Sequence, residues 1–127
     1  MSQIIATTLS NGSVSVSTAT VVNGSAKAWV NFNGSGTIAA RDSFNVASLT
    51  DNGTGDYTVN LTNSFDNANY AVYGGALSAA IAGGTYVLGP VSIATGSFRV
   101  AVCRNDENVT TATDRSIVTA AAHGDLA

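Results

Sequence analysis

The chain has 127 residues, a length that suits one domain with its own core. Charged side chains make up 10% of it, against about 25% in ordinary soluble domains, and the formal net charge is −3. The basic residues are scattered singly, at Lys27, Arg41, Arg99, Arg104 and Arg115. Electrostatic binding of nucleic acid needs a basic stripe or patch, so the sequence predicts no nucleic-acid partner.

Low charge also bears on assembly, because surface charge is what normally keeps copies of a protein apart. We therefore expect much of the surface outside the core to be buried against other subunits. Cys103 is the single cysteine, which excludes an intrachain disulfide and a zinc site built from cysteines.

Neither export nor membrane insertion is predicted. Residues 1–5 lack the basic and apolar regions of a signal peptide, so we expect synthesis in a reducing cytoplasm. Residues 67–98 carry no formal charge, but glycines and Pro90 interrupt them. No window there reaches the roughly 18 continuous apolar residues that a membrane-spanning helix requires.

Residues 1–22 are predicted to form an extended N-terminal arm. Apolar and hydroxyl-bearing side chains alternate there, most clearly over residues 12–17, which indicates a strand with one buried face. The segment has almost no bulky side chains, so it buries too little area to fold alone. We expect it to pack on its own domain or on a neighbour.

Residues 23–127 are predicted to form a single β domain, which begins at the Asn23-Gly24 turn signal. In its first strand the core-facing side carries Ala28, Val30 and Phe32, and the opposite side begins with Trp29.

A turn rich in glycine and aspartate, residues 51–56, precedes the clearest amphipathic strand of the chain. That strand places Tyr57, Val59 and Leu61 on one face.

The other elements are expected to be short strands and turns. They are 37–40 and 43–46 (strands), 69–73 (a strand stopped by Gly74 and Gly75), 76–82 (a loop), 85–88, 91–93 and 97–103 (strands), 104–108 (a polar turn) and 116–120 (the last strand). Short strands with closely spaced turn signals and no convincing helix indicate an all-β fold. We expect an antiparallel β-sandwich or a jelly-roll-like knob, with the strand order left open.

Two glycine-rich motifs have simpler interpretations than a ligand site. Residues 34–39 match the dinucleotide-binding pattern, but that pattern needs a helix next and a strand is expected here, so we interpret it as a hairpin. Residues 51–56 suggest a calcium loop, yet they lack the spacing and the closing glutamate of an EF-hand, which favours a turn.

Two single residues were considered for catalysis. His123 is the only histidine, no G-x-S-x-G motif accompanies it, and we interpret it as a partly exposed residue near the end of the chain. Cys103 lies near Arg99 and Arg104 in the sequence, and basic neighbours are typical of reactive thiols. Arg104 should point to the opposite face of the strand, so a buried structural thiol is favoured. No catalytic, cofactor-binding or metal-binding residue is assigned.

The residues from Lys27 to Asn60 resemble a module of tailed-bacteriophage virion proteins, many of them tail-fibre or other structural proteins. The resemblance is carried by KAWVNFNG at 27–34, RDSFNV at 41–46 and DNGTGDYTVN at 51–60. It is close over residues 25–75 and loose as far as the ending at 124–127, and nothing can be aligned over residues 76–115. It implies a non-enzymatic, homotrimeric β-structured knob on a virion, made in the host cytoplasm, and it carries over no functional residues.

Fibre proteins with this module usually place it behind an anchoring region and a shaft, whereas about 25 residues precede it here. We therefore expect a trimeric head decoration (cement) protein that stabilises the capsid. Its partner would be the major capsid protein or another virion protein, contacted through residues 1–22. The alternative is a short tail fibre or fibre-tip protein that binds a host surface receptor. A small carbohydrate-active enzyme is disfavoured, because no well-placed carboxylate pair is evident.

Overall fold

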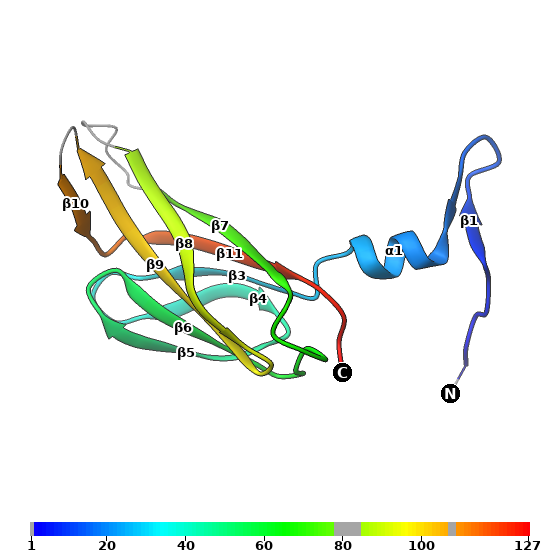
Figure 1. The fold of residues 1–127 in the computed structure, drawn as a ribbon, viewed down its shortest axis with the longest axis horizontal. Coiled ribbons are helices and arrows are strands. Elements are labelled where there is room, and N and C mark those ends of the chain that lie inside the picture. Colours follow the sequence, from blue (N-terminus) through cyan, green and yellow to red (C-terminus); the bar gives the residue numbers. More distant parts are fainter. Residues whose placement is uncertain (1, 78–84, 107–108) are drawn as a thin grey trace.

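The computed structural model describes residues 2–77, 85–106 and 109–127, in which the chain forms an antiparallel β-sandwich with an N-terminal projection (Figure 1). The first sheet has the strand order β4-β3-β11-β7. Its strands are β3 (Ala28–Asn33), β4 (Ala39–Phe44), β7 (Ala71–Leu77) and β11 (Ile117–His123).

The second sheet is organised around β9, which pairs antiparallel with β6, β8 and β10, while β5 pairs with β6. Its strands are β5 (Val46–Gly53), β6 (Asp56–Leu61), β8 (Thr85–Ala94), β9 (Ser97–Asp106) and β10 (Val109–Ala112). The all-β sandwich predicted from the sequence is confirmed.

The core lies between the sheets and is filled by alternate residues of β3, β6, β9 and β11. Its buried side chains are Ala28, Val30, Phe32, Tyr57, Val59, Phe65, Tyr70, Phe98, Val100, Val102, Val118, Ala120 and Ala122. The predicted faces are confirmed, because Phe32 and Val59 are fully buried whereas Trp29 is 38% exposed. The rings of Phe32 and Tyr57 meet edge to face across the sandwich, with centroids 5.1 Å apart.

The chain crosses from the first sheet to the second at Asn45, which has φ 57°. Its side-chain amide nitrogen donates to the carbonyls of Lys27 and Asn63, both at 3.0 Å, and its side-chain oxygen accepts from the backbone N–H of Asn63 at 2.7 Å. Asparagine tolerates this left-handed conformation better than most residues do. The strands predicted at 37–40 and 43–46 are therefore divided differently, with the break at residue 45.

The turn predicted at residues 51–56 is confirmed. Gly53 and Gly55 have φ of 134° and 67°, and the Asp51 carboxylate accepts the backbone N–H of Gly53 at 2.9 Å. The turn joins β5 to β6 at the end of the sandwich opposite the N-terminal projection (Figure 1).

The prediction that Gly74 and Gly75 stop a strand is wrong, because β7 runs through both as far as Leu77. A side chain at Gly74 would collide with the backbone of Thr119 in the neighbouring strand β11. Glycine is present here because the strands approach closely, and not because the strand ends. The loop predicted at 76–82 lies mostly outside the described residues, and Ala76 and Leu77 belong to β7.

Three other strands extend further than predicted. The segments expected at 85–88 and 91–93 form one strand, β8, whose register shifts between Pro90 and Ser92. Residues 104–106, expected in a polar turn, continue β9, and residues 107–108 lie outside the described residues. The last strand, β11, extends the prediction to His123.

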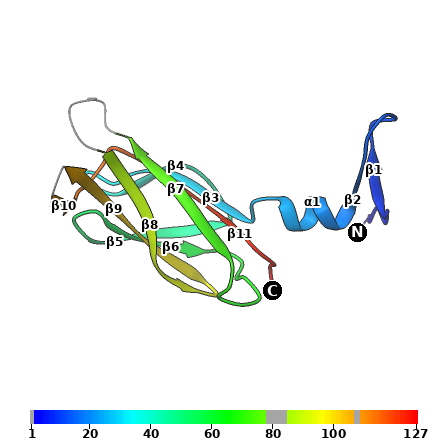
Figure 2. The same cartoon turned by 45° about the horizontal axis from the view of Figure 1, so that its top comes forward.

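The N-terminal segment contains β1 (Thr8–Ser10), β2 (Ser15–Ser17) and a short helix, α1 (Thr18–Gly24), and it projects away from the sandwich (Figures 1 and 2). The expectation of no helix is wrong here. Both β1 and β2 are exposed throughout, so the segment does not pack on its own domain, and of the two expected packing surfaces only that of a neighbour remains. The main chain first bonds to the sandwich at Lys27, whose N–H donates to the Ala122 carbonyl at 2.9 Å. We call residues 2–26 the arm.

Candidate functional site

The arm is the first candidate, because its described hydrogen bonds are local and it buries none of its side chains. The Ser17 hydroxyl accepts the backbone N–H of Thr20 at 3.1 Å and so caps α1. The backbone N–H of Thr18 donates to the Thr7 carbonyl at 2.9 Å, which ties the helix to the hairpin. At the other end of α1, the Lys27 ammonium donates to the carbonyls of Val22 and Ser25, where a cation complements the helix dipole.

The arm carries no charged residue, and its apolar side chains alternate with hydroxyl and amide side chains. Its exposed large apolar side chains are Ile4, Ile5, Leu9, Val14, Val16, Val21 and Val22. Leu9 lies opposite Val16 in the β1–β2 register. These two residues and Val14, with Ser10 and Asn11, line a shallow hollow of about 340 Å³ on the hairpin. The hairpin therefore presents an apolar surface that no described residue of the chain covers.

The second candidate lies on the outer face of the first sheet. Trp29 pairs with Phe44 on one side and with Ala121 on the other, and Ala121 pairs in turn with Tyr73. We call these four residues the aromatic row. Phe44 is 52% exposed and Tyr73 54% exposed, so three aromatic rings lie uncovered along one line across the sheet.

His123 belongs to the edge of this row. Its Nε2 atom lies 2.8 Å from the Tyr73 hydroxyl, and the two ring centroids are 5.5 Å apart. The residue is half-buried at the end of β11, as expected from the sequence. Its contact with Tyr73 fixes the position of that ring, a structural role that needs no catalytic partner.

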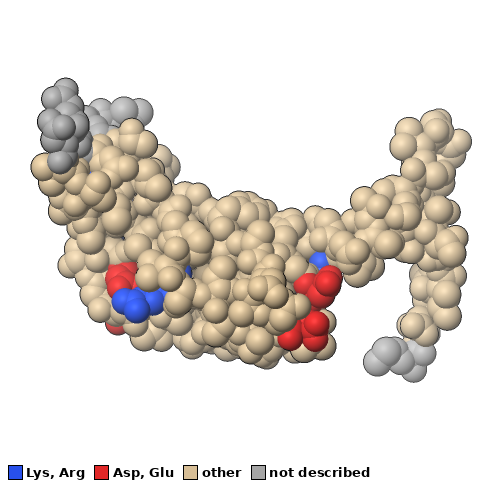
Figure 3. All heavy atoms as spheres, viewed as in Figure 1, with Lys and Arg blue, Asp and Glu red and all other residues tan. Residues whose placement is uncertain are grey.

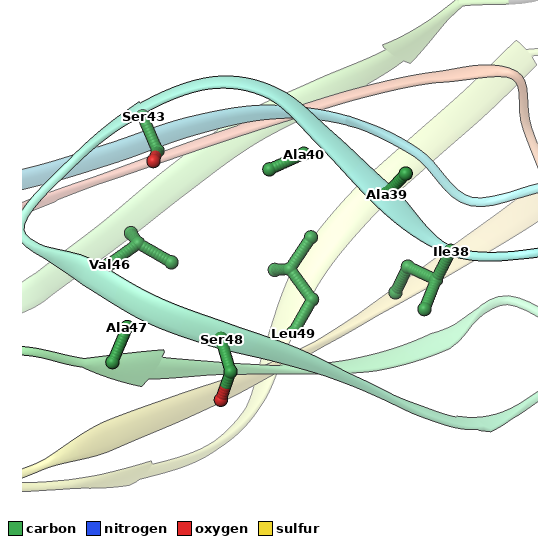
Figure 4. A pocket seen from close by; sticks show the side chains of 8 residues that line it. All are labelled: Ile38, Ala39, Ala40, Ser43, Val46, Ala47, Ser48 and Leu49. Carbon is green, nitrogen blue, oxygen red and sulfur yellow. The ribbon is translucent and has the colours of Figure 1, made fainter.

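A hollow of about 300 Å³ opens between β4 and β5, at the edges of the two sheets (Figure 4). The side chains of Ile38, Val46 and Leu49 point into it, and Ser43 lies on the β4 side, whereas the Ser48 hydroxyl points away and accepts a hydrogen bond from Asn60 at 3.1 Å. A second hollow, of about 350 Å³, lies over β8 and β9 between Val87, Pro90 and Cys103. Neither is lined by a charged side chain, so neither offers an acid or a base for chemistry.

The structure corrects the assignment of Cys103. Phe98, Val100 and Val102 point into the core, so Cys103 falls on the outer face of β9, where it is only half-buried. Its expected burial is wrong, because β9 places odd-numbered residues outward.

The two glycine-rich motifs are turns, as predicted. Residues 34–38 connect β3 to β4, an antiparallel hairpin, and no helix follows them. In the turn at 51–56 the Asp56 carboxylate is occupied by the Arg99 guanidinium, with Nε at 2.7 Å from Oδ1. That guanidinium holds the pKa of Asp56 below its ordinary value.

Charged side chains are sparse on the molecular surface. On the face of the molecule that Figure 3 shows, they lie in two places. Acidic and basic side chains meet in one place, and the other is mainly acidic. Within the described ranges, no three His, Cys, Asp or Glu side chains gather where they could hold a metal ion. No helix in that part of the chain is long and apolar enough to cross a membrane.

Sequence reasoning placed Trp29 on the outer face of its strand but missed the aromatic row. The row exists only once β4, β3, β11 and β7 pair in this register, and strand order was not predictable. Comparison with protein-family models, with curated proteins and with solved structures finds no match to this chain.

Proposed function

We propose that the protein is a non-enzymatic structural protein of a tailed-bacteriophage virion, a homotrimeric head decoration protein that stabilises the capsid. One observation carries the proposal: an uncharged arm with exposed apolar side chains projects from one end of a charge-poor β-sandwich, and no described residue of the chain buries those side chains. The phage setting comes from the resemblance of residues 27–60 to virion modules. The major capsid protein, or another virion protein, is the proposed partner on the particle.

The energetics of the arm support an attachment role. Fixing the backbone of one residue costs roughly 1–2 kcal/mol of conformational entropy. Burial of apolar side chains is what normally offsets this cost, and the arm buries none of its side chains within the chain. A surface outside the subunit must therefore supply the burial that keeps the arm ordered.

The polar side chains of the sandwich also suit a structural protein. Asp114 accepts the backbone N–H of Gly55 at 2.7 Å and lies 2.8 Å from the Tyr57 hydroxyl, and Asp56 pairs with Arg99. These carboxylates hold turns and strands together, and each is already occupied by a partner from the same chain.

Electron microscopy of intact particles tests the location directly. Density on the head shell supports decoration, and density only at the tail contradicts it. A second test compares the full chain with a chain lacking residues 2–22 in co-sedimentation with empty heads. All buried core residues lie between Ala28 and Ala122, so the shortened chain keeps its core and is expected to lose head binding. Head binding retained by the shortened chain would exclude the arm as the attachment.

The alternative is a short tail fibre or fibre-tip protein that binds a host surface receptor. It is favoured by the polarity of the molecule, since the arm and the β5–β6 turn lie at opposite ends (Figure 1). An attached arm would present that far end to a host cell. In this case the chain lacking residues 2–22 should still bind host cells, and neither form should bind heads.

A further inference from the structure

We propose that the arm of one subunit packs on the aromatic row of a second copy of this chain. The inference rests on the proposed self-association: the hairpin of the arm covers a neighbouring subunit, and the exposed residues outside the hairpin, Ile4, Ile5, Val21 and Val22, remain for the capsid. The two surfaces are the uncovered apolar face of the β1–β2 hairpin and the row formed by Phe44, Trp29, Ala121 and Tyr73.

The aromatic row has the chemistry of an interface centre. Aromatic residues are enriched and charged residues are depleted at the centres of protein interfaces, and Trp and Tyr dominate their binding energy. Adjacent strands are spaced by about 4.8 Å, so Trp29 and Tyr73, two strands apart, stand roughly 10 Å from each other. Ala121 lies between them in the register, and its small side chain separates the two large rings.

The hairpin and the row are both free of charge. The shallow hollow between Leu9, Val14 and Val16 offers apolar contacts to a protruding ring. Residues 2–26 carry no charge, and neither does any member of the row, although Asp42 flanks Phe44 on the same face of β4.

The geometry points to a second copy rather than to the same subunit. The arm leaves the sandwich at the start of β3, immediately before Trp29, and it points away from its own sheet in both ribbon views (Figures 1 and 2). The arm and the row therefore lie at the same end of every subunit. When each subunit passes its arm to the next around a rotation axis, every arm and every row is covered and the assembly closes.

Trp29 is the only tryptophan, so its fluorescence reports on the row alone. In the full chain we expect blue-shifted emission and poor quenching by acrylamide. Leu9→Ser/Val16→Ser removes the apolar face of the hairpin without touching the core, and it should raise the quenching constant several-fold. Val91→Ser, at an exposed apolar residue of the second sheet, is the matched control and should leave quenching unchanged.

A mixing experiment separates a second copy from the same chain. Trp29→Phe gives a full-length donor that has the arm but no tryptophan signal. It is refolded together with the Leu9→Ser/Val16→Ser chain, whose Trp29 is the reporter. Renewed protection of Trp29 supports the proposal, because only the donor can supply an intact arm. A donor that also carries Leu9→Ser/Val16→Ser should give no protection.

Three outcomes overturn the inference. Equal quenching of the full chain and the Leu9→Ser/Val16→Ser variant shows that the arm does not cover the row. If Trp29 is protected in the full chain but the donor does not restore its protection in the refolded mixture, the arm packs on its own sheet. If Trp29 is freely quenched in the protein alone and is protected only when oligosaccharides are added, the row is a glycan-binding surface. All of these readouts use the protein alone, so they are independent of where it lies on a particle.

Discussion

Tyr57 connects three parts of the molecule through one side chain. Its ring packs against Phe32 of the opposite sheet, and its hydroxyl lies 2.7 Å from the Gly34 carbonyl and 2.8 Å from the Asp114 carboxylate. Burial and the neighbouring carboxylate raise the pKa of the phenol far above its ordinary value. Tyr57 therefore stays protonated, and it holds the β3–β4 turn and the segment before β11 at the end of the sandwich away from the arm.

Phe32 tests the assignment of the core face. Its side chain is fully buried at the centre of the sandwich, so Phe32→Ala should lower the free energy of unfolding by about 3–5 kcal/mol. Val91→Ala, at an exposed apolar residue, should change it by no more than about 0.5 kcal/mol. Urea unfolding followed by circular dichroism measures both. A loss below about 1 kcal/mol for Phe32→Ala would place this ring outside the core.

Asp56 should make stability depend on acid pH. Because Arg99 lowers its pKa in the folded state, the unfolded chain binds a proton more readily than the folded chain does. The stabilisation that the Asp56–Arg99 pair gives the folded state is fully present above the ordinary aspartate pKa of about 3.9. It is lost as the pH falls through the lower pKa that Asp56 has in the folded state. Burial raises the pKa of Tyr70 to about 12, so this phenol does not titrate in the same range.

We expect Asp56→Asn to flatten the acid side of the pH–stability curve and to lower stability modestly at neutral pH. The effect is modest because the side chains of Asp56 and Arg99 are 25% and 42% exposed, so water screens the pair. Thermal unfolding from neutral to strongly acidic pH measures it. Arg99→Gln added to Asp56→Asn should change the acid slope no further, and an additional change of slope would show that Arg99 acts through another carboxylate.

At the scale of elements, adjacent glycines in β7 test how closely that strand packs on β11. A Cβ at Gly74 would meet the Thr119 backbone, whereas a Cβ at Gly75 would find its nearest neighbour, the Thr119 hydroxyl, at 3.9 Å. Gly74→Ala should therefore cost about 1–3 kcal/mol or more in unfolding free energy, as overpacking does. Gly75→Ala should be neutral within about 0.5 kcal/mol. Equal effects of the two substitutions, measured by denaturant unfolding, would contradict this packing.

The period-two patterns predicted the strands that fill the core. β3, β6 and β9 each alternate apolar and polar residues along most of their length, so the buried face of each strand could be predicted from the sequence. The same alternation predicted that Trp29 lies on the outer face. The turn at 51–56 was predictable because its glycines and aspartates have strong local preferences. These features depend on neighbours in the sequence and need no knowledge of the fold.

Features that depend on distant residues were missed. Gly74 resembled a strand end, because the approach of Thr119 cannot be inferred from the local sequence. Helix α1 was missed because its β-branched residues favour strands, and only the Ser17 cap indicates a helix start. The aromatic row needs the register of four strands, so Phe44 and Tyr73 could not be joined to Trp29 in advance.

At the scale of the whole molecule, the arm and the C-terminus leave the same end of the sandwich, and the β5–β6 turn marks the other (Figure 1). The uncovered apolar residues of the arm and the aromatic row both lie toward the first of these ends. Under the proposed assembly, the first end would be covered by another subunit and the second would remain free for display. This polarity fits either a decoration protein or a fibre tip, and in both cases the assembly end must meet another protein.

The full chain should be a homotrimer in solution. Its surface carries few charges to keep copies apart, and the arm and the row each expose apolar side chains that association would bury. Native mass spectrometry should give three times the mass of the chain, and light scattering should give the same value without a monomer fraction on dilution to micromolar concentration. An obligate interface persists at that concentration, because its folded subunits depend on one another. A stable micromolar monomer would contradict both the trimer and the exchange of arms, whereas a dimer or a larger ring would keep the exchange and change only its symmetry.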